Sequence, residues 1–191
     1  MAVLDDFNRS DGAPGANWAQ AISTYSLPNI VSNALDYPQF PSGYWTTQFA
    51  ADQWVSLKRN VAGNVQVILR LTSPNSGSES YIRVQADMLG GNGTEAYKVV
   101  AGTTTSLGFE SGVMQATDAY LKVEVSGTTI NSYASTDGAS WSFRKTWDTG
   151  GAVSGAGYIG FYNPNNTNAG SIDDFGGGNI ATPPAAYVTI R

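Results

Sequence analysis

The chain of 191 residues contains neither cysteine nor histidine. Without cysteine it has no disulfide bond, no thiolate metal site and no cysteine nucleophile. Without histidine it lacks the commonest general base and the commonest metal ligand, and every Ser-His-Asp triad is excluded. Catalysis in this chain would therefore depend on carboxylates, lysine or tyrosine.

Positive charge is also scarce. Ten Lys and Arg residues stand against fifteen Asp and Glu residues, which gives a formal net charge of −5. Because no basic stretch is present, we expect no nucleic-acid partner. No apolar run approaches the roughly 18 residues that a membrane span needs, so we expect no membrane insertion. The N-terminal segment has neither the basic nor the apolar region of a signal peptide.

Helical periodicity is missing, and two-residue alternation takes its place. In residues 52–60, Val55 and Leu57 alternate with polar side chains, and the segments 64–72, 80–88 and 120–126 alternate in the same way. Turn sequences rich in Gly, Asn and Ser separate these segments. The pattern predicts an all-β protein, a two-sheet antiparallel β-sandwich of the jelly-roll type.

The predicted sandwich domain covers residues 1–178, and a C-terminal arm covers residues 179–191. Pro183 and Pro184 separate a short alternating end, Tyr187-Val188-Thr189-Ile190, from the rest of the chain. One interpretation is a frayed terminus. The other is an arm that adds a strand to the sheet edge of a neighbouring subunit.

The polar faces of the predicted strands carry aromatic, amide and guanidinium groups. Such groups recognise sugars, because rings provide a stacking platform and planar polar groups provide hydrogen bonds. If the strands are neighbours, one shared face is a candidate carbohydrate-binding site. The alternative is an ordinary solvated face. The candidate residues are Trp54, Gln66, Arg70, Tyr81, Arg83 and Gln85.

The glutamates do not form a recognisable catalytic pattern. A retaining glycosidase needs two carboxyl groups about 5–5.5 Å apart. None of the four glutamates has another carboxylate within four residues, although separate strands could bring two of them together. We therefore predict that the chain is not an enzyme. The four residues are Glu79, Glu95, Glu110 and Glu124.

The segment STDGASW, residues 135–141, combines a turn signal with a large aromatic residue. Asp137-Gly138 favours a tight hairpin, since glycine tolerates positive φ. Ser135 and Ser140 are placed to bond local backbone groups, and we expect Trp141 to cover the core. The segment is one residue shorter than the Asp-box of sialidases, so a structural role is the preferred interpretation.

The triplet Asp-Asp-Phe occurs twice, as residues 5–7 and 173–175. Three hypotheses explain the repeat: a catalytic carboxylate pair, a metal site, or the place where the first and last strands meet. Carboxylates could also accept backbone N–H groups at the strand ends.

Residues 4–18, LDDFNRSDGAPGANW, open an ordered set of motifs that continues with VILR, YIRVQ, LKVEVSGTTI, STDGASW and the closing SIDDFGGG. The set resembles concanavalin A-like lectin/glucanase (laminin G-like) jelly-roll domains of the kind found in tailed-bacteriophage virion proteins. The resemblance implies that the first and last strands lie side by side. It also implies a structural Ca²⁺ as the cofactor, with Asp5, Asp6, Asp173 and Asp174 as candidate ligands. The catalytic E-x-D-x-x-E strand of the glucanase branch is lacking.

The resemblance implies a bacteriophage virion protein, either a capsid or tail decoration protein or a minor tail protein, and the lack of a catalytic pattern favours a non-enzymatic one. It would bind a host cell-surface glycan, form a homo-oligomer and contact other virion subunits. We expect synthesis in a host cytoplasm and assembly into the virion. The alternative is a carbohydrate-active enzyme of the glycoside hydrolase type, or its carbohydrate-binding module.

Overall fold

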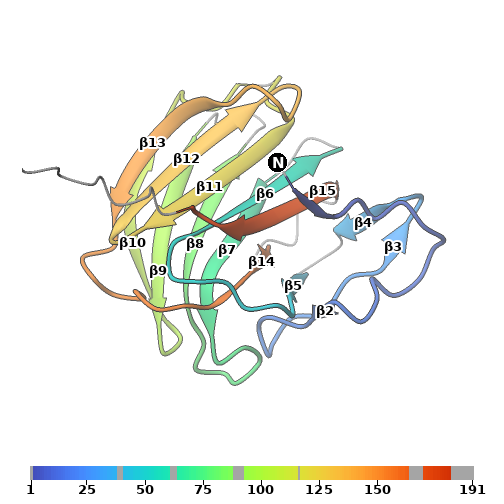
Figure 1. Cartoon of the computed structure of the whole chain (residues 1–191), viewed down its shortest axis with the longest axis horizontal. Coiled ribbons are helices and arrows are strands. Elements are labelled where there is room, and N and C mark those ends of the chain that lie inside the picture. Colours follow the sequence, from blue (N-terminus) through green and yellow to red (C-terminus); the bar gives the residue numbers. More distant parts are fainter. Residues whose placement is uncertain are drawn as a thin grey trace, which may run out of the picture.

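The computed structural model describes residues 2–37, 41–60, 64–87, 93–115, 117–163 and 170–181. In these ranges all regular secondary structure is β-strand, and the strands form two antiparallel sheets that pack face to face (Figure 1). Over the same ranges, no helix has the length and apolar character of a membrane span. The predicted all-β sandwich is confirmed.

The eight-stranded sheet forms the front layer in Figure 1. Its order is β13 (Ser142–Asp148), β12 (Thr129–Ser135), β11 (Tyr120–Ser126), β6 (Gln53–Arg59), β15 (Gly170–Asn179), β4 (Ala34–Tyr37) and β3 (Ile30–Val31), with β1 (Val3–Asp5) beside β15. Alternation in β6 and β11 directs one set of side chains to the core and the other set to the outside.

The seven-stranded sheet lies behind it (Figure 1). Its order is β10 (Thr103–Glu110), β9 (Thr94–Val100), β8 (Ser80–Asp87), β7 (Asn64–Thr72), β14 (Tyr158–Tyr162), β5 (Ser42–Trp45) and β2 (Trp18–Ala19). The strands expected in segments 52–60, 64–72, 80–88 and 120–126 all form, with ends that differ by at most one residue.

The core lies between the sheets and consists of side chains from alternate strand positions. In the eight-stranded sheet these are Val55, Leu57, Leu121, Val123, Val125 and Ile130, and in the seven-stranded sheet they are Val65, Val67, Leu69, Ile82, Val84 and Ala86. All are buried. Removing this apolar surface from water is the main stabilising contribution to the sandwich.

A β-bulge interrupts the alternation of β7. The register with β8 shifts between Leu69 and Thr72, and Arg70 adopts a positive φ of 52°. One residue of a bulge turns the following side chains to the opposite face. Leu71 therefore packs in a second apolar cluster with Ile68 and Tyr81, not with Leu69 in the main core as the alternation predicts.

The first and last strands meet, as the resemblance implies and as one of the three hypotheses for the repeated triplet states. β1 pairs with β15, with Val3 opposite Gly176 and Asp5 opposite Phe175. Phe7 and Phe175 are both fully buried. Their ring centroids lie 5.7 Å and 4.8 Å from the ring of Trp18, so both ends of the domain pack on one tryptophan.

The sandwich extends slightly beyond the predicted boundary at residue 178. Asn179 pairs with Gln53, and its side-chain Oδ1 accepts a hydrogen bond from the Ala50 N–H at 2.7 Å. The Ile180 N–H donates to the carbonyl of Asp52 at 2.9 Å. The rest of the predicted arm, residues 182–191, lies outside the described residues.

The Asp5 carboxylate joins the N-terminal segment to the core. It accepts two hydrogen bonds from the Arg9 guanidinium, at 2.7 and 2.9 Å, and one from Trp18 Nε1 at 2.8 Å. The Phe7 N–H donates a fourth at 2.8 Å. Burial alone would raise the pKa of Asp5, but these hydrogen bonds outweigh it and lower that pKa below its ordinary value.

Replacing Asp5 by alanine should destabilise the fold, because Trp18 and Phe7 would keep buried donors without an acceptor. We expect a loss of about 2–3 kcal/mol in the free energy of unfolding. The matched control is Asp6→Ala, since Asp6 is exposed and accepts one local hydrogen bond from the Asn8 N–H. Urea denaturation of both variants at neutral pH measures the difference. Equal stability of the two variants would contradict the assigned role of Asp5.

Candidate functional site

The six residues predicted to bind carbohydrate do not share one face. Trp54 belongs to β6 of the eight-stranded sheet, whereas Gln66, Tyr81, Arg83 and Gln85 belong to β7 and β8 of the other sheet. Both groups point outward, away from the core, and therefore to opposite sides of the sandwich. The expected shared face does not include Trp54, because the chain crosses from one sheet to the other between β6 and β7.

Arg70 is also misplaced by the sequence pattern. Its side chain is 1% exposed and lies near the end of the sandwich, a consequence of the bulge in β7. The guanidinium donates to the backbone carbonyls of Ala51, Gly127 and Val153 at 2.6 to 3.0 Å. Arg70 therefore fixes three loop segments and does not contribute to an exposed binding face.

The outer face of the seven-stranded sheet carries two parallel rows of side chains. Residues directly opposite each other in an antiparallel pair lie on the same face. The first row, called the polar row, consists of Gln66, Gln85, Glu95 and Phe109. The second row contains Ile68, Arg83, Tyr97 and Ser106. Three of the predicted binding residues, Gln66, Arg83 and Gln85, are brought together here.

Arg83 lies between two tyrosine rings. Its guanidinium carbon is 4.0 Å from the centroid of Tyr97 and 5.3 Å from that of Tyr162. Arginine stacks well on aromatic faces, and the contact strengthens when water is excluded. Arg83 is 8% exposed, and its Nε has no hydrogen-bond partner in the described part of the chain. The buried Arg83 guanidinium therefore holds the Tyr97 ring in place on the outer face of the sheet.

Several residues of this face are covered by the chain itself. Ala21 and Ile22 pack with Tyr81, which is 6% exposed, and Gln66 has no exposed surface. The buried amide of Gln66 donates to Gln85 Oε1 at 3.2 Å. Gln66, Tyr81 and Arg83 therefore support the surface, and Gln85 alone of the predicted residues on this sheet keeps a partly exposed side chain.

The open part of the face comes from residues that the sequence analysis did not select. Glu95 and Tyr97 of β9 are half-buried, and Phe109 of β10 is 57% exposed. Glu95 accepts a hydrogen bond from Ser106 Oγ at 2.8 Å. The alternation of TEAYKVV in β9 is the signal that would have placed Glu95 and Tyr97 on one face.

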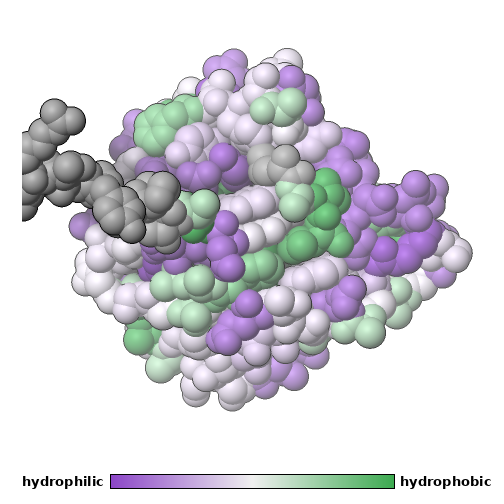
Figure 2. Space-filling view, in the orientation of Figure 1, coloured by the Kyte–Doolittle hydropathy of each residue, from purple (hydrophilic) through white to green (hydrophobic). Residues whose placement is uncertain are grey.

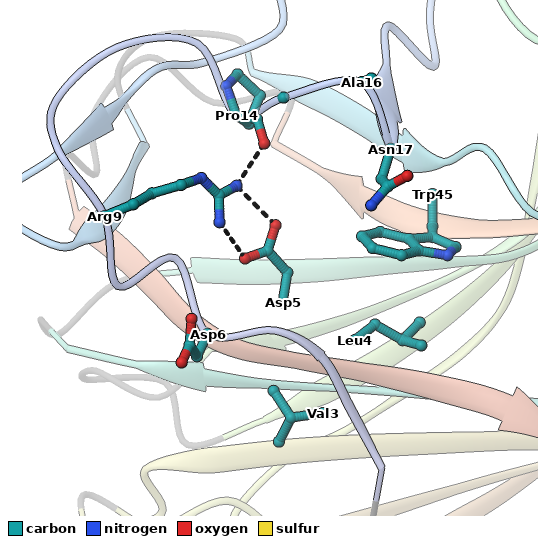
Figure 3. A pocket seen from close by; sticks show the side chains of 10 residues that line it. Val3, Leu4, Asp5, Asp6, Arg9, Pro14, Ala16, Asn17 and Trp45 are labelled. Atoms are coloured by element: carbon teal, nitrogen blue, oxygen red, sulfur yellow. Dashed lines mark hydrogen bonds and ion pairs between the residues drawn. The ribbon is translucent and has the colours of Figure 1, made fainter.

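A cavity of about 530 Å³ lies beside the first Asp-Asp-Phe triplet (Figure 3). In Figure 3, Arg9 reaches Asp5 and the Pro14 carbonyl, while Trp45, Leu4 and Val3 lie away from the ion pair. Calcium takes six to eight oxygen ligands. Asp5 already binds a guanidinium, which would repel a cation, and Asp6 accepts the Asn8 N–H.

The second triplet does not complete a calcium site. Asp173 and Asp174 lie 3.5 and 3.9 Å from Lys58 Nζ, and Asp174 also accepts a hydrogen bond from the Tyr120 hydroxyl. In the described part of the chain, no three acidic side chains come together as a metal site requires. The donor set formed by Asp5, Asp6, Asp173 and Asp174 does not fit Ca²⁺, and the four residues act as structural acceptors instead.

Comparison with known proteins identifies the architecture. No protein-family model and no curated protein matches the sequence. Among solved structures, the chain is similar to the carbohydrate-binding module CBM66 from Bacillus subtilis. The TM-score is 0.57 at 11% identity, over 85% of this chain and 96% of that one. The chain has the concanavalin A-like jelly-roll fold.

Two further structures share this jelly roll. The Bacillus licheniformis β-glucanase matches with a TM-score of 0.57 and 12% identity, over 93% of this chain and 97% of that one. The exoplasmic/lumenal domain of VIP36, in a form bound to Ca²⁺ and Man3GlcNAc, matches with a TM-score of 0.57 and 10% identity, over 87% and 85%. At these identities the similarity concerns the fold, and the predicted virion role stays a prediction.

Tyr97 should make the jelly roll sensitive to alkali. Burial and the neighbouring Glu95 raise the pKa of Tyr97 from 10.0 to about 12. Above pH 10 the unfolded chain loses this proton while the folded chain retains it. Stability is therefore full below pH 10 and declines as the pH rises toward 12. We expect this decline, measured by urea denaturation at each pH, to be smaller in Tyr97→Phe. An identical decline in both proteins would contradict the assignment.

Proposed function

We propose that this jelly roll is a non-catalytic carbohydrate-binding domain and that the outer face of the seven-stranded sheet holds the glycan. The observation that carries the proposal is the polar row with Tyr97 beside it: Gln85 and Glu95 lie next to one partly exposed ring and one exposed ring. Amide and carboxylate groups bond sugar hydroxyls, and aromatic rings pack against the apolar C–H side of a sugar.

Preorganisation supports this assignment. Tyr97 is held from below by Arg83, and Gln85 is held by Gln66. Rings and amides that are already fixed lose little conformational entropy on binding. The structural neighbours agree in kind, since their names include a carbohydrate-binding module and a Man3GlcNAc-bound lumenal domain.

The chemistry of the face favours binding without hydrolysis. A glycoside hydrolase places two carboxyl groups on either side of the scissile bond. Among the described side chains of the polar row, Glu95 is the single carboxylate; it lies between Gln85 and Phe109, and the next residue of the row is the amide Gln66. An amide cannot replace the acid or the base, because near neutral pH it is too weak both as a proton donor and as a proton acceptor.

Truncation of either ring, the exposed Phe109 or the half-buried Tyr97, should weaken glycan binding without unfolding the domain. We expect Phe109→Ala and Tyr97→Ala to weaken binding at least about tenfold. A glycan array identifies the ligand, and isothermal titration calorimetry then measures the affinity of each variant.

Phe143→Ala is the matched control for Phe109→Ala. Phe143 is also 57% exposed but lies on β13 of the opposite sheet. Its truncation should leave glycan binding at this face unchanged. If Phe109→Ala and Tyr97→Ala both bind like the unmodified protein, the glycan site is not on this face.

The non-catalytic assignment has its own test. We expect no release of reducing sugar when the protein is incubated with the glycan identified on the array. Release by the unmodified protein that disappears in Glu95→Gln would contradict the proposal and support a glycoside hydrolase.

A further inference from the structure

A pocket of about 210 Å³ lies on the outer face of the eight-stranded sheet, opposite the face discussed above. Figure 2 looks onto this outer face, which is largely pale and green with purple patches. The pocket is lined by Val3, Ser56, Tyr120, Asp137, Gly138, Trp141 and Asp174. It is smaller than the roughly 300–1,000 Å³ pockets that bind drug-sized ligands, so it fits a single ring.

Two aromatic rings form part of the pocket wall. Tyr120 and Trp141 meet edge to face, with centroids 6.5 Å apart. Both are partly exposed, and Trp141 lies outside the buried core clusters. The prediction that Trp141 covers the core was wrong. The hairpin loop between β12 and β13 is longer than a two-residue turn, and it presents the indole to the outside.

The loop that carries Trp141 is fixed by its own hydrogen bonds, as the sequence predicts for Ser135; Ser140 takes part through its backbone N–H, and the Asp137 carboxylate is an acceptor that the sequence analysis did not name. Asp137 Oδ1 accepts from the N–H groups of Ala139 and Ser140 at 2.8 Å, and Ser135 Oγ accepts from the Gly138 N–H. The hydrogen bonds that its carboxylate accepts from the Ser140 and Ala139 N–H groups and from the Ser135 hydroxyl lower the pKa of Asp137 to about 2. Gly138 has a φ of +72°, and a Cβ there would lie 3.0 Å from the Tyr120 ring. The loop and the ring are therefore fitted to each other.

The charges around the pocket are balanced. Asp174 forms an ion pair with Lys58 Nζ at 3.9 Å and accepts a hydrogen bond from the Tyr120 hydroxyl. On the other side, Lys122 Nζ lies 5.3 Å from the ring of Trp141. A pocket built for an organic cation would keep its carboxylates and ring faces free of lysine. The arrangement instead offers carboxylate, hydroxyl and ring surfaces to a neutral ligand.

We infer that this pocket is a second sugar site, which binds one ring of a neutral glycan against Trp141 and Tyr120, with Asp137, Asp174 and Ser56 accepting its hydroxyl groups. This inference goes beyond the proposed function, because the pocket lies on the opposite sheet and shares no residue with the polar row. One molecule with sites on both faces would bind two glycan chains and link them.

The test follows the Trp141 indole N–H in two-dimensional NMR spectra, with its signal assigned from a Trp141→Phe variant. Methyl glycosides of glucose, galactose and mannose are titrated separately. We expect at least one of them to shift the Trp141 signal in the unmodified protein and in Tyr97→Ala. No shift with any of the three glycosides would overturn the inference, and so would a shift caused only by choline, used as a cationic probe.

Variants then separate the two sites. Trp141→Ala and Tyr120→Ala should each weaken the binding of the active glycoside at this pocket at least about tenfold. Phe143→Ala, on the same sheet but outside the pocket lining, should leave it unchanged. Unchanged binding in both Trp141→Ala and Tyr120→Ala would overturn the inference. Loss of array binding in Tyr97→Ala, with an unaffected Trp141 signal, would support both sites as independent.

Discussion

The Asp5 carboxylate is the interaction on which the closure of the sandwich depends. It brings together Arg9, Trp18 and the Phe7 N–H, and Trp18 in turn contacts the rings of Phe7, Phe161 and Phe175. A buried carboxylate is costly unless its lone pairs are satisfied. Four hydrogen bonds to this carboxylate offset the cost of burying its charge. The same bonds hold the N-terminal segment beside the last strand.

The two outer faces of the sandwich have different physical characters. On the seven-stranded sheet, the segment containing Ala21 and Ile22 covers much of the surface, and the open remainder is a row beside a fixed tyrosine. On the outer face of the eight-stranded sheet, the loop between β12 and β13 forms a pocket together with residues of β1, β6, β11 and β15. In both places aromatic rings are held by a cation or by a neighbouring ring, so their positions do not depend on a ligand.

Local sequence patterns predicted the positions of the strands well, but they did not predict which sheet each strand joins. Alternation in β6, β7, β8 and β11 identified the core residues, because only the two-residue period of a strand buries one set of side chains. The same period could not show that β6 and β7 belong to different sheets, and Trp54 was therefore placed on the wrong face. The sheet to which a strand belongs is decided by long-range pairing.

The remaining errors have equally specific causes. At the bulge, Arg70 adopts a positive φ, and the segment VILRLT contains no glycine or asparagine that would predict such a conformation. Tyr81 is buried by Ala21 and Ile22, which lie some sixty positions earlier in the chain, so the residue pattern of β8 alone could not predict this burial. The repeated triplet was informative because its two copies lie on neighbouring strands, the first at the end of β1 and the second within β15, as the resemblance to jelly-roll domains implied.

The pairing of β1 with β15 also has a mechanical consequence. Because the strands are antiparallel and Val3 lies opposite Gly176, Ala2 and Ala181 leave the sheet in the same direction. A force that separates these two points loads the hydrogen bonds between β1 and β15 one after another, as in opening a zipper, and not all together. Hydrogen bonds loaded one at a time break at a lower force than hydrogen bonds loaded together. Once they have opened, the load falls on the contact between Asp5 and Trp18. Under tension, the pairing of β1 with β15 should therefore open first, and the buried contact between Asp5 and Trp18 should limit further opening.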